Sequence, residues 1–207
     1  MPDVFQKSKL LLMKLMKTNK IIMLIITTLL FCMCKNNQTP RPSGYYRIEL
    51  PPHYYVKNDT IGPYIAEVSK YCTTMESDNK LATNDDEWIN LYYPTFNATI
   101  HLSYKKINNN FSIITEESRQ LVYEHTIRAD AINESFYSNP ENNTYCIYYE
   151  LKGNAASPAQ FYVTDSTNHF LRGALYFNNI PNSDSIAPVN VYIQQDIIHL
   201  IETLKWK

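Results

Sequence analysis

Glycine is scarce in this sequence, with 4 residues among 207, whereas tyrosine occurs 17 times. Phosphate-binding loops need closely spaced glycines, and the sequence contains neither G-x-G-x-x-G nor a Walker loop. The hydrolase motifs G-x-S-x-G and H-E-x-x-H are missing as well. Cysteine and histidine show no metal-binding spacing, so we expect neither a metal nor another cofactor. The many tyrosines favour β-strands.

Positive charge is scarce beyond the N-terminal segment. Residues 1–33 hold five lysines and one acid, which leaves 14 bases and 19 acids in residues 34–207. A domain with a net charge of −5 lacks the basic surface that binds DNA or RNA. We therefore expect no nucleic acid among its partners. The domain also lacks a polybasic patch for anionic lipid.

The sequence has no apolar run long enough to span a bilayer. Residues 21–31 form an uncharged run of 11, whereas a membrane-spanning helix needs about 20 residues. The run has the length of the apolar region of a secretory signal peptide, with Lys14, Lys17 and Lys20 as its positive flank. We therefore predict that the chain is exported.

A cysteine follows the apolar run almost directly, which is typical of a bacterial lipoprotein. We predict a signal peptide over 1–33, an acylated Cys34 and a lipidated tether over 34–44. Cys32 is the alternative acylation site, and both cysteines follow a residue bulkier than the small one usual at such sites. An uncleaved N-terminal anchor with two incidental thiols is the competing interpretation. Two or more acyl chains would hold the protein stably at the membrane.

Two further cysteines, Cys72 and Cys146, lie in the exported part of the chain. Thiols in an oxidising compartment can pair, so a Cys72–Cys146 disulfide is one interpretation. Two buried free thiols are the other, because a separation of 74 residues says nothing about whether the side chains meet.

Apolar and polar residues alternate in several short segments, as expected for β-strands. The clearest case places Ile100, Leu102 and Tyr104 on one face and His101 on the other. Residues 57–87 are polar, and we expect a loop there that ends in the acidic cluster 85–87. The predicted strands are 45–50, 88–93, 98–104, 145–151, 159–164 and 169–177.

Two segments have the periodicity of amphipathic helices. The first begins at Thr115 as N-cap and continues through His125 to Ile132, and the second is capped by Asp184 or Ser185. The apolar stripe of the second consists of Val189, Ile193, Ile197, Leu200, Ile201 and Leu204. Strands joined by short turns pair antiparallel, and both helices must bury their stripes. We therefore predict an α+β fold, an antiparallel sheet packed by two amphipathic helices, as a single domain over 45–207.

A run of small residues separates the strands predicted at 145–151 and 159–164. Small side chains let another backbone or a ligand approach closely. We expect this run and the exposed face of strand 169–177, with His169 and Arg172, to form a partner-binding surface; a simple tight turn is the competing interpretation. The run contains Gly153, Asn154, Ala155, Ala156 and Ser157.

Catalytic chemistry has little support in the sequence. His125 lies on the apolar face of a predicted helix, where a buried histidine with satisfied hydrogen bonds is the common case. His125 or His169 would need an acid such as Asp130, Asp165 or Asp196 brought close by the fold. A small periplasmic hydrolase or ligand carrier using His125 or His169 is therefore the alternative to a non-catalytic protein.

Several long motifs, in this order, resemble the gliding motility lipoprotein GldD family of Bacteroidota. They are P-R-P-S-G-Y-Y-R-I (40–48), T-E-E-S-R (115–119), H-T-I-R-A-D-A-I (125–132), K-G-N-A-A-S (152–157), Q-F-Y-V-T-D-S-T (160–167), H-F-L-R-G-A-L-Y-F-N (169–178) and H-L-I-E-T-L-K-W-K (199–207). The order of strands and helices is also similar to the PsbP-type sandwich, as an analogy of fold alone.

The resemblance implies a non-catalytic lipoprotein required for gliding motility and the linked type IX secretion system. It implies partners among other gliding and type IX secretion lipoproteins or ring components, and attachment to the membrane through the lipid anchor. Residues 35–38 hold no acid of the kind that follows the cysteine in surface-exported lipoproteins of this phylum. We therefore expect a domain that faces the periplasm, and we favour the outer membrane slightly over the inner membrane.

Overall fold

The computed structural model of the protein describes residues 13, 16–20, 23, 47–60, 62–76, 87–124, 129–179 and 182–207. The chain divides into two compact units, Met1–Gly44 and Tyr45–Lys207. Residues 16–20 of the first unit are helical. No helix in the described part of the chain combines the length and the apolar character needed to cross a membrane. The predicted acylation sites Cys32 and Cys34 lie outside the described residues.

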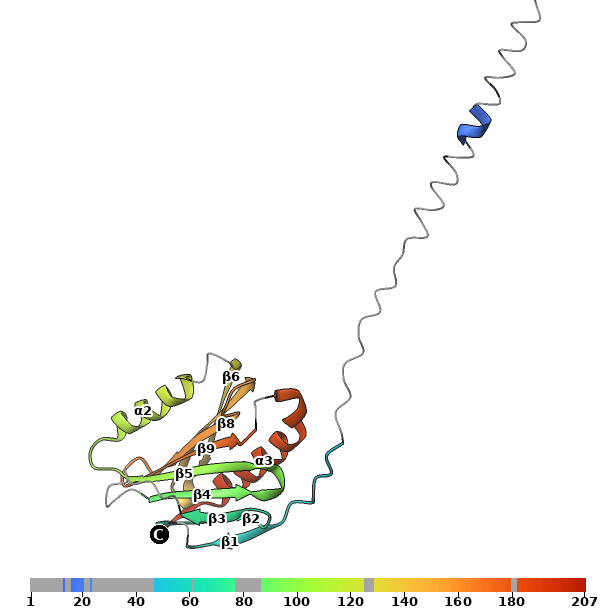
Figure 1. The fold of residues 1–207 in the computed structure, drawn as a ribbon. Coiled ribbons are helices and arrows are strands. Elements are labelled where there is room, and N and C mark those ends of the chain that lie inside the picture. Colours follow the sequence, from blue (N-terminus) through green and yellow to red (C-terminus); the bar gives the residue numbers. More distant parts are fainter. Residues whose placement is uncertain are drawn as a thin grey trace, which may run out of the picture. The chain divides into compact units, whose positions relative to one another are not determined.

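The second unit has an α+β fold, as predicted, with antiparallel strands in two sheets and two long helices (Figure 1). The larger sheet has seven strands in the order β3-β4-β5-β9-β8-β7-β6, and the smaller has the order β1-β2-β10. The analogy to the PsbP-type sandwich stays a prediction. The elements are β1 (Tyr55–Asn58), β2 (Tyr64–Ser69), β3 (Thr73–Glu76), β4 (Glu87–Tyr93), η1 (Pro94–Phe96), β5 (Ala98–Lys106), α2 (Phe111–Tyr123), β6 (Ala129–Asn139), η3 (Pro140–Asn142), β7 (Thr144–Gly153), β8 (Ala159–Thr164), β9 (His169–Phe177), α3 (Ser183–Thr203) and β10 (Lys205–Trp206).

The main core lies between α3, β2 and one face of the larger sheet, which we call the inner face. The predicted stripe of α3 is buried along its whole length, and Ile193 and Ile197 have no exposed surface. Strands β5, β8 and β9 contribute alternate residues such as Ile100, Phe161 and Leu171. Gly173 in β9 leaves room for the ring of Phe161, because a Cβ atom at position 173 would lie 2.2 Å from that ring.

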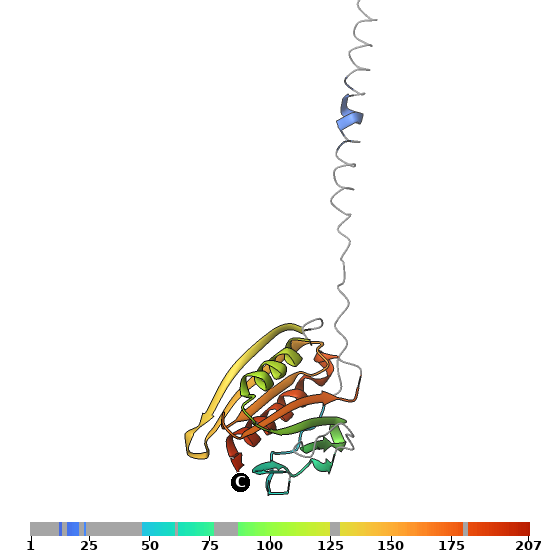
Figure 2. The ribbon, with the colours of Figure 1, turned by 90° about the vertical axis from the view of Figure 1, so that its left-hand side faces the viewer.

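Helix α2 packs against the opposite, outer face of the larger sheet, so the two helices sandwich the sheet (Figure 2). Its contacts are two small apolar clusters. Val122 meets Tyr149 and Leu151 in one, and Ile114 meets Phe170 in the other. Most of the helix surface is exposed, so α2 covers only part of the outer face.

The predicted helix over 115–132 is wrong in both bounds. Helix α2 begins at Phe111, and the Thr115 hydroxyl donates to the carbonyl of Phe111 within the helix instead of capping it. Residues 129–139 form strand β6, so Ala129 and Ile132 pair with β7. Both residues fit a helical stripe and one face of a strand, and long-range pairing with β7 decides between them.

The N-terminal strand is also displaced from its prediction. Residues 47–54 have no regular structure, and the loop predicted over 57–87 contains strands β2 and β3. In β2 the buried residues Tyr64, Ala66 and Val68 alternate with partly exposed ones. Asp85 and Asp86 lie outside the described residues. The cap of α3 is Asn182, whose side-chain oxygen accepts from the Ser185 backbone N–H, and not Asp184 or Ser185.

Candidate interaction surface

Strand register places a set of polar and aromatic side chains in two rows on the outer face. One row runs across four strands through Trp88, Ser103, Arg172 and Tyr162, and the next runs through Asn90, His101, Ala174 and Gln160. Because side chains alternate between the faces of a strand, these residues point away from the core under α3. The exposed and partly exposed members, which are all of these residues except the buried Gln160 and Ala174, form the candidate interaction surface.

Arg172 is the charged centre of this surface. Its Nη2 atom donates to the side-chain oxygen of Gln160 at 2.6 Å, and the Gln160 side chain is completely buried. Burial lowers the pKa of the guanidinium, while the hydroxyl of Tyr176 has a smaller opposing influence. Among the described residues, no Asp or Glu side chain forms an ion pair with Arg172.

A cavity of about 100 Å³ separates α2 from the outer face beside Arg172. Trp88 and Arg172 line it from the sheet, and Ile114, Glu117 and Ser118 line it from α2. Lys105 also lines the cavity, and its ammonium group lies 3.9 Å from the Glu117 carboxylate. The cavity therefore combines an aromatic wall with two cations and one anion.

His101 faces outward beside Arg172, as the strand alternation predicts. Its Nδ1 atom lies 2.7 Å from the side-chain oxygen of Asn90, and its ring meets that of Tyr176 edge-on. Loss of solvation and then the positive charge of Arg172 lower the pKa of His101 from its ordinary value of 6.5. Both influences favour the neutral form of the imidazole next to the guanidinium.

The predicted surface over β9 combined residues that the structure places on opposite faces. Arg172 lies on the outer face, whereas His169 points to the other side, where its ring stacks on Trp206 with centroids 4.9 Å apart. The Tyr104 hydroxyl lies 2.9 Å from His169 Nδ1. The two residues are three positions apart, an odd offset, so the two-residue period of the strand places them on opposite faces.

The small-residue run serves local packing. Ala155 is buried against Val122 in the outer cluster, and Ser157 is completely buried, with its hydroxyl donating to the carbonyl of Ala159. Asn154 accepts from the backbone N–H of Ser183 at the start of α3. Of the five residues of this run that were proposed for binding, Asn154 and Ala156 are exposed.

Gly153 ends β7 with a φ of +91°, a conformation that other residues rarely adopt. A Cβ atom at this position would also lie 2.7 Å from the carboxylate of Asp130. The glycine therefore meets a requirement of the backbone, which explains its place at the β7 end of this run.

Asp165, a proposed partner of His169, organises a turn. Burial opposes its ionisation, but backbone N–H groups of His169, Asn168 and Thr167 donate to its carboxylate, and the net effect lowers its pKa. The imidazole of His169 forms no ion pair with a described carboxylate. His125 lies outside the described residues.

Asp196 pairs with a histidine that the sequence analysis did not single out. The Asp196 carboxylate lies 2.7 Å from Nδ1 of His53 and accepts from the buried Tyr93 hydroxyl at 3.0 Å. The ring of His53 stacks on Tyr192 of α3, with centroids 4.1 Å apart. Burial, and then the charge of Asp196, raise the pKa of Tyr93. This network fastens the segment before β1 to α3.

A second histidine contact secures β1 and β2 to the same helix. The ring of His199 stacks on Tyr55 with centroids 3.6 Å apart, and its Nε2 atom lies 2.7 Å from the Glu67 carboxylate. The hydroxyl of Thr203 accepts from the backbone N–H of Glu67. The contacts of His53, His169 and His199 are thus explained by packing between elements.

Cys72 and Cys146 are free thiols, so the disulfide interpretation is not supported by the structure. Cys72 precedes β3 at one edge of the larger sheet, and Cys146 lies on β7. Five strand spacings of about 4.8 Å separate β3 from β7, whereas a disulfide joins Cα atoms less than about 7 Å apart. Burial raises the pKa of the Cys72 thiol to about 12.

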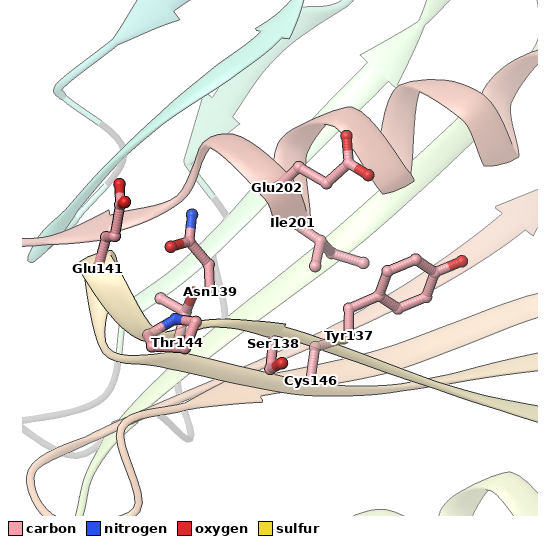
Figure 3. Close-up of a pocket in the computed structure, with 9 residues that line it drawn as sticks. Tyr137, Ser138, Asn139, Glu141, Thr144, Cys146, Ile201 and Glu202 are labelled. Atoms are coloured by element: carbon pink, nitrogen blue, oxygen red, sulfur yellow. The ribbon is translucent and has the colours of Figure 1, made fainter.

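A hollow near the end of α3 lies at the β6–β7 hairpin (Figure 3). Its volume is about 300 Å³, and the Tyr137 ring and Ile201 form its apolar wall. The carboxylates of Glu141 and Glu202 stand at its rim on separate elements. Within the described residues, no group of three or more His, Cys, Asp or Glu side chains could hold a metal ion.

Comparisons with known proteins give one result. The family model described as gliding motility lipoprotein GldD matches residues 35–206. Neither the curated proteins nor the solved structures gave a match to the chain. The family match starts directly after Cys34 and takes in the whole of the α+β unit up to Trp206. The chain therefore belongs to the gliding motility lipoprotein GldD family.

Proposed function

We propose that this lipoprotein acts without catalysis, by binding and stabilising other components of the gliding machinery and of the linked type IX secretion system. The domain faces the periplasm and is held at the membrane, the outer membrane by preference, through acyl chains on Cys34. Membership of the family supports the role in gliding. The contact surface is the outer face around Arg172.

The observation that carries this proposal is the difference in cover between the two faces of the sheet. The inner face packs against α3 and β2 in one large cluster, whereas the outer face packs against α2 in two small ones. His101 is exposed on this face, and Arg172 is partly exposed beside α2. Arginine and aromatic side chains are enriched in the centres of protein interfaces.

The proposal is tested by complementing a deletion strain with variants of the full-length gene. Arg172→Glu should abolish gliding and secretion while the protein still accumulates, because a reversed charge repels whatever the arginine attracts. Lys106→Glu is the matched control, since it reverses an exposed charge at the far end of β5 and should leave both activities intact. Gly153 is unsuitable for such a test because any side chain there strains the backbone.

Affinity capture of the tagged, membrane-extracted protein identifies the partners. We expect other gliding or secretion lipoproteins, or ring components, in stoichiometric amount with the wild type and with Lys106→Glu, and their loss with Arg172→Glu. An Arg172→Glu protein that accumulates normally, supports gliding and retains every partner would exclude the outer face as the contact surface.

The lipid anchor is tested separately, by mass spectrometry of the N-terminal peptide. Cys34→Ala should abolish acylation and release the protein from the membrane fraction, whereas Cys32→Ala should change neither. Acylation that persists in Cys34→Ala and disappears in Cys32→Ala would move the anchor to Cys32.

A further inference from the structure

Three buried N–H donors on the outer face have no acceptor. They are Nε of Arg172, Nε1 of Trp88 and Nε2 of Gln160, and none has a hydrogen-bond partner within the described part of the chain. Buried polar atoms are nearly always paired in native proteins, so three such atoms in two adjacent rows require an explanation. All three can only donate, so an acceptor would satisfy each of them.

The orientation of the Gln160 amide follows from its contact with Arg172. The guanidinium can only donate, so the side-chain atom 2.6 Å from its Nη2 must be the oxygen. The amide NH2 of Gln160 therefore points away from Arg172, and rotating the amide group would place two donors in contact. The contact with Arg172 therefore identifies the unpaired atom of Gln160 as Nε2, which is a donor.

The charge of Arg172 is a second reason to expect an acceptor at this surface. Arginine stays protonated in proteins, and a buried charge is costly unless it is paired. Glu117 lines the same cavity, but its ion-pair contact is with Lys105, at 3.9 Å. The cavity thus keeps one positive charge in excess, beside two N–H groups of Trp88 and Arg172 that point to no acceptor.

We propose that the cavity between α2 and the outer face binds an oxyanion, a carboxylate or a phosphate group, through Arg172 and the indole N–H of Trp88. The cavity volume of about 100 Å³ suits one such group and not an extended ligand. Arginine is well matched to this chemistry because its N–H groups are arranged to meet two oxygens at once. Lys105 strengthens the attraction, and Glu117 weakens it.

The site shares Arg172 with the proposed contact surface, but it would bind its anion whether or not the outer face docks a machinery component. The oxyanion has two sources of the same chemistry, a free small anion and a carboxylate presented by a partner. Capture experiments with and without added acetate distinguish them. Acetate that displaces a captured partner assigns the carboxylate to that partner, whereas acetate that binds and leaves the capture unchanged assigns the site to a free anion.

The test uses Trp88 as its own reporter, because the chain has only two tryptophans. In a full-length Trp206→Phe protein, Trp88 is the sole source of indole emission. Sodium acetate and sodium phosphate, added at constant ionic strength with chloride as the replaced ion, should change this emission saturably. The indole N–H resonances of the 15N-labelled wild-type chain give the same information if Trp206→Phe does not fold.

Two variants should move the affinity in opposite directions. Arg172→Gln should weaken acetate binding at least tenfold, and Glu117→Gln should tighten it, because the first removes the cation and the second the competing carboxylate. Lys106→Gln, which removes an exposed charge outside the cavity, should leave it unchanged. The proposal would be overturned if the Trp88 signal responded to neither anion with Arg172 present. It would also be overturned if the signal responded equally with Arg172 and with Arg172→Gln.

Discussion

Asp196 and Arg172 are charged side chains on opposite sides of the larger sheet, the first buried and the second partly buried, and their surroundings differ. Asp196, over the inner face, has His53 and the Tyr93 hydroxyl within 3.0 Å. Arg172, on the outer face, has the neutral amide of Gln160, and its Nε has no partner among the described residues. A compensated charge is typical of a structural element, whereas an uncompensated one points to a ligand from outside the domain.

The apolar contacts follow the same division. The inner face belongs to one continuous cluster that joins α3, β2 and five strands of the larger sheet. The outer clusters contain few fully buried residues, such as Val122 and Ile114. We conclude that the inner face supplies most of the stability of the fold and leaves the outer face free to be selected for binding.

The largest expected effect is on the inner face. Ile193→Ala removes a side chain with no exposed surface and should lower the free energy of unfolding by about 4 kcal/mol, because the close-packed core cannot collapse into the cavity. Denaturant unfolding of the full chain in detergent measures this loss. Val191→Ala on the exposed side of α3 should change stability by less than about 0.5 kcal/mol. A loss from Ile114→Ala on α2 as large as that from Ile193→Ala would contradict the division between the faces.

The second-largest loss of stability should follow from removing the compensated charge of Asp196. Asp196→Asn keeps the shape of the side chain but removes the charge that His53 and Tyr93 contact, and it should cost about 2 kcal/mol. The same denaturant unfolding measures it. Glu202→Gln neutralises an exposed carboxylate on the same helix and should be nearly neutral. Equal losses from the two variants would show that the network around Asp196 contributes nothing.

Removing the uncompensated charge of Arg172 should change stability less than Ile193→Ala or Asp196→Asn does. Arg172→Gln should change the free energy of unfolding by less than about 1 kcal/mol, because the lost hydrogen bond to Gln160 is offset by removal of a partly buried charge that has no ion-pair partner among the described residues. Thermal and denaturant unfolding without added anion provide the measurement. A loss as large as that of Asp196→Asn would mean that Arg172 is a structural residue, and the interpretation of the outer face would fail.

Periodicity predicted the elements in which burial alone decides the structure. The stripe of α3 and the alternation in β5 are correct because their apolar faces meet the core. Strand β6 was missed since most of its residues are exposed, so its pattern carries no alternation. Strand β2 does alternate, through Tyr64, Ala66 and Val68, and this signal could have been found.

The candidate site was predicted in part. Arg172 was proposed for binding from its strand, but its relation to Trp88 and Gln160 depends on β4 and β8, which follow from the strand order and not from local sequence. The same limit hid the His53–Asp196 contact, which joins residues 143 positions apart. Grouping His169 with Arg172 ignored the two-residue period of β9, although that period was visible in the sequence.

The smallest expected effect concerns His101, whose pKa is lowered by loss of solvation and then by Arg172. Arg172→Gln should raise this pKa toward 6.5, and NMR titration of the ring protons of the five histidines measures it. Because the folded pKa lies below the unfolded one, the unfolded chain binds the proton more readily, and stability falls as the pH drops below about 6.5. The wild type should therefore lose more stability on acidification than Arg172→Gln, with Lys106→Gln as the control for a general loss of charge. An unchanged pKa in Arg172→Gln would show that solvation alone sets it, and that the guanidinium does not act on its neighbours across the outer face.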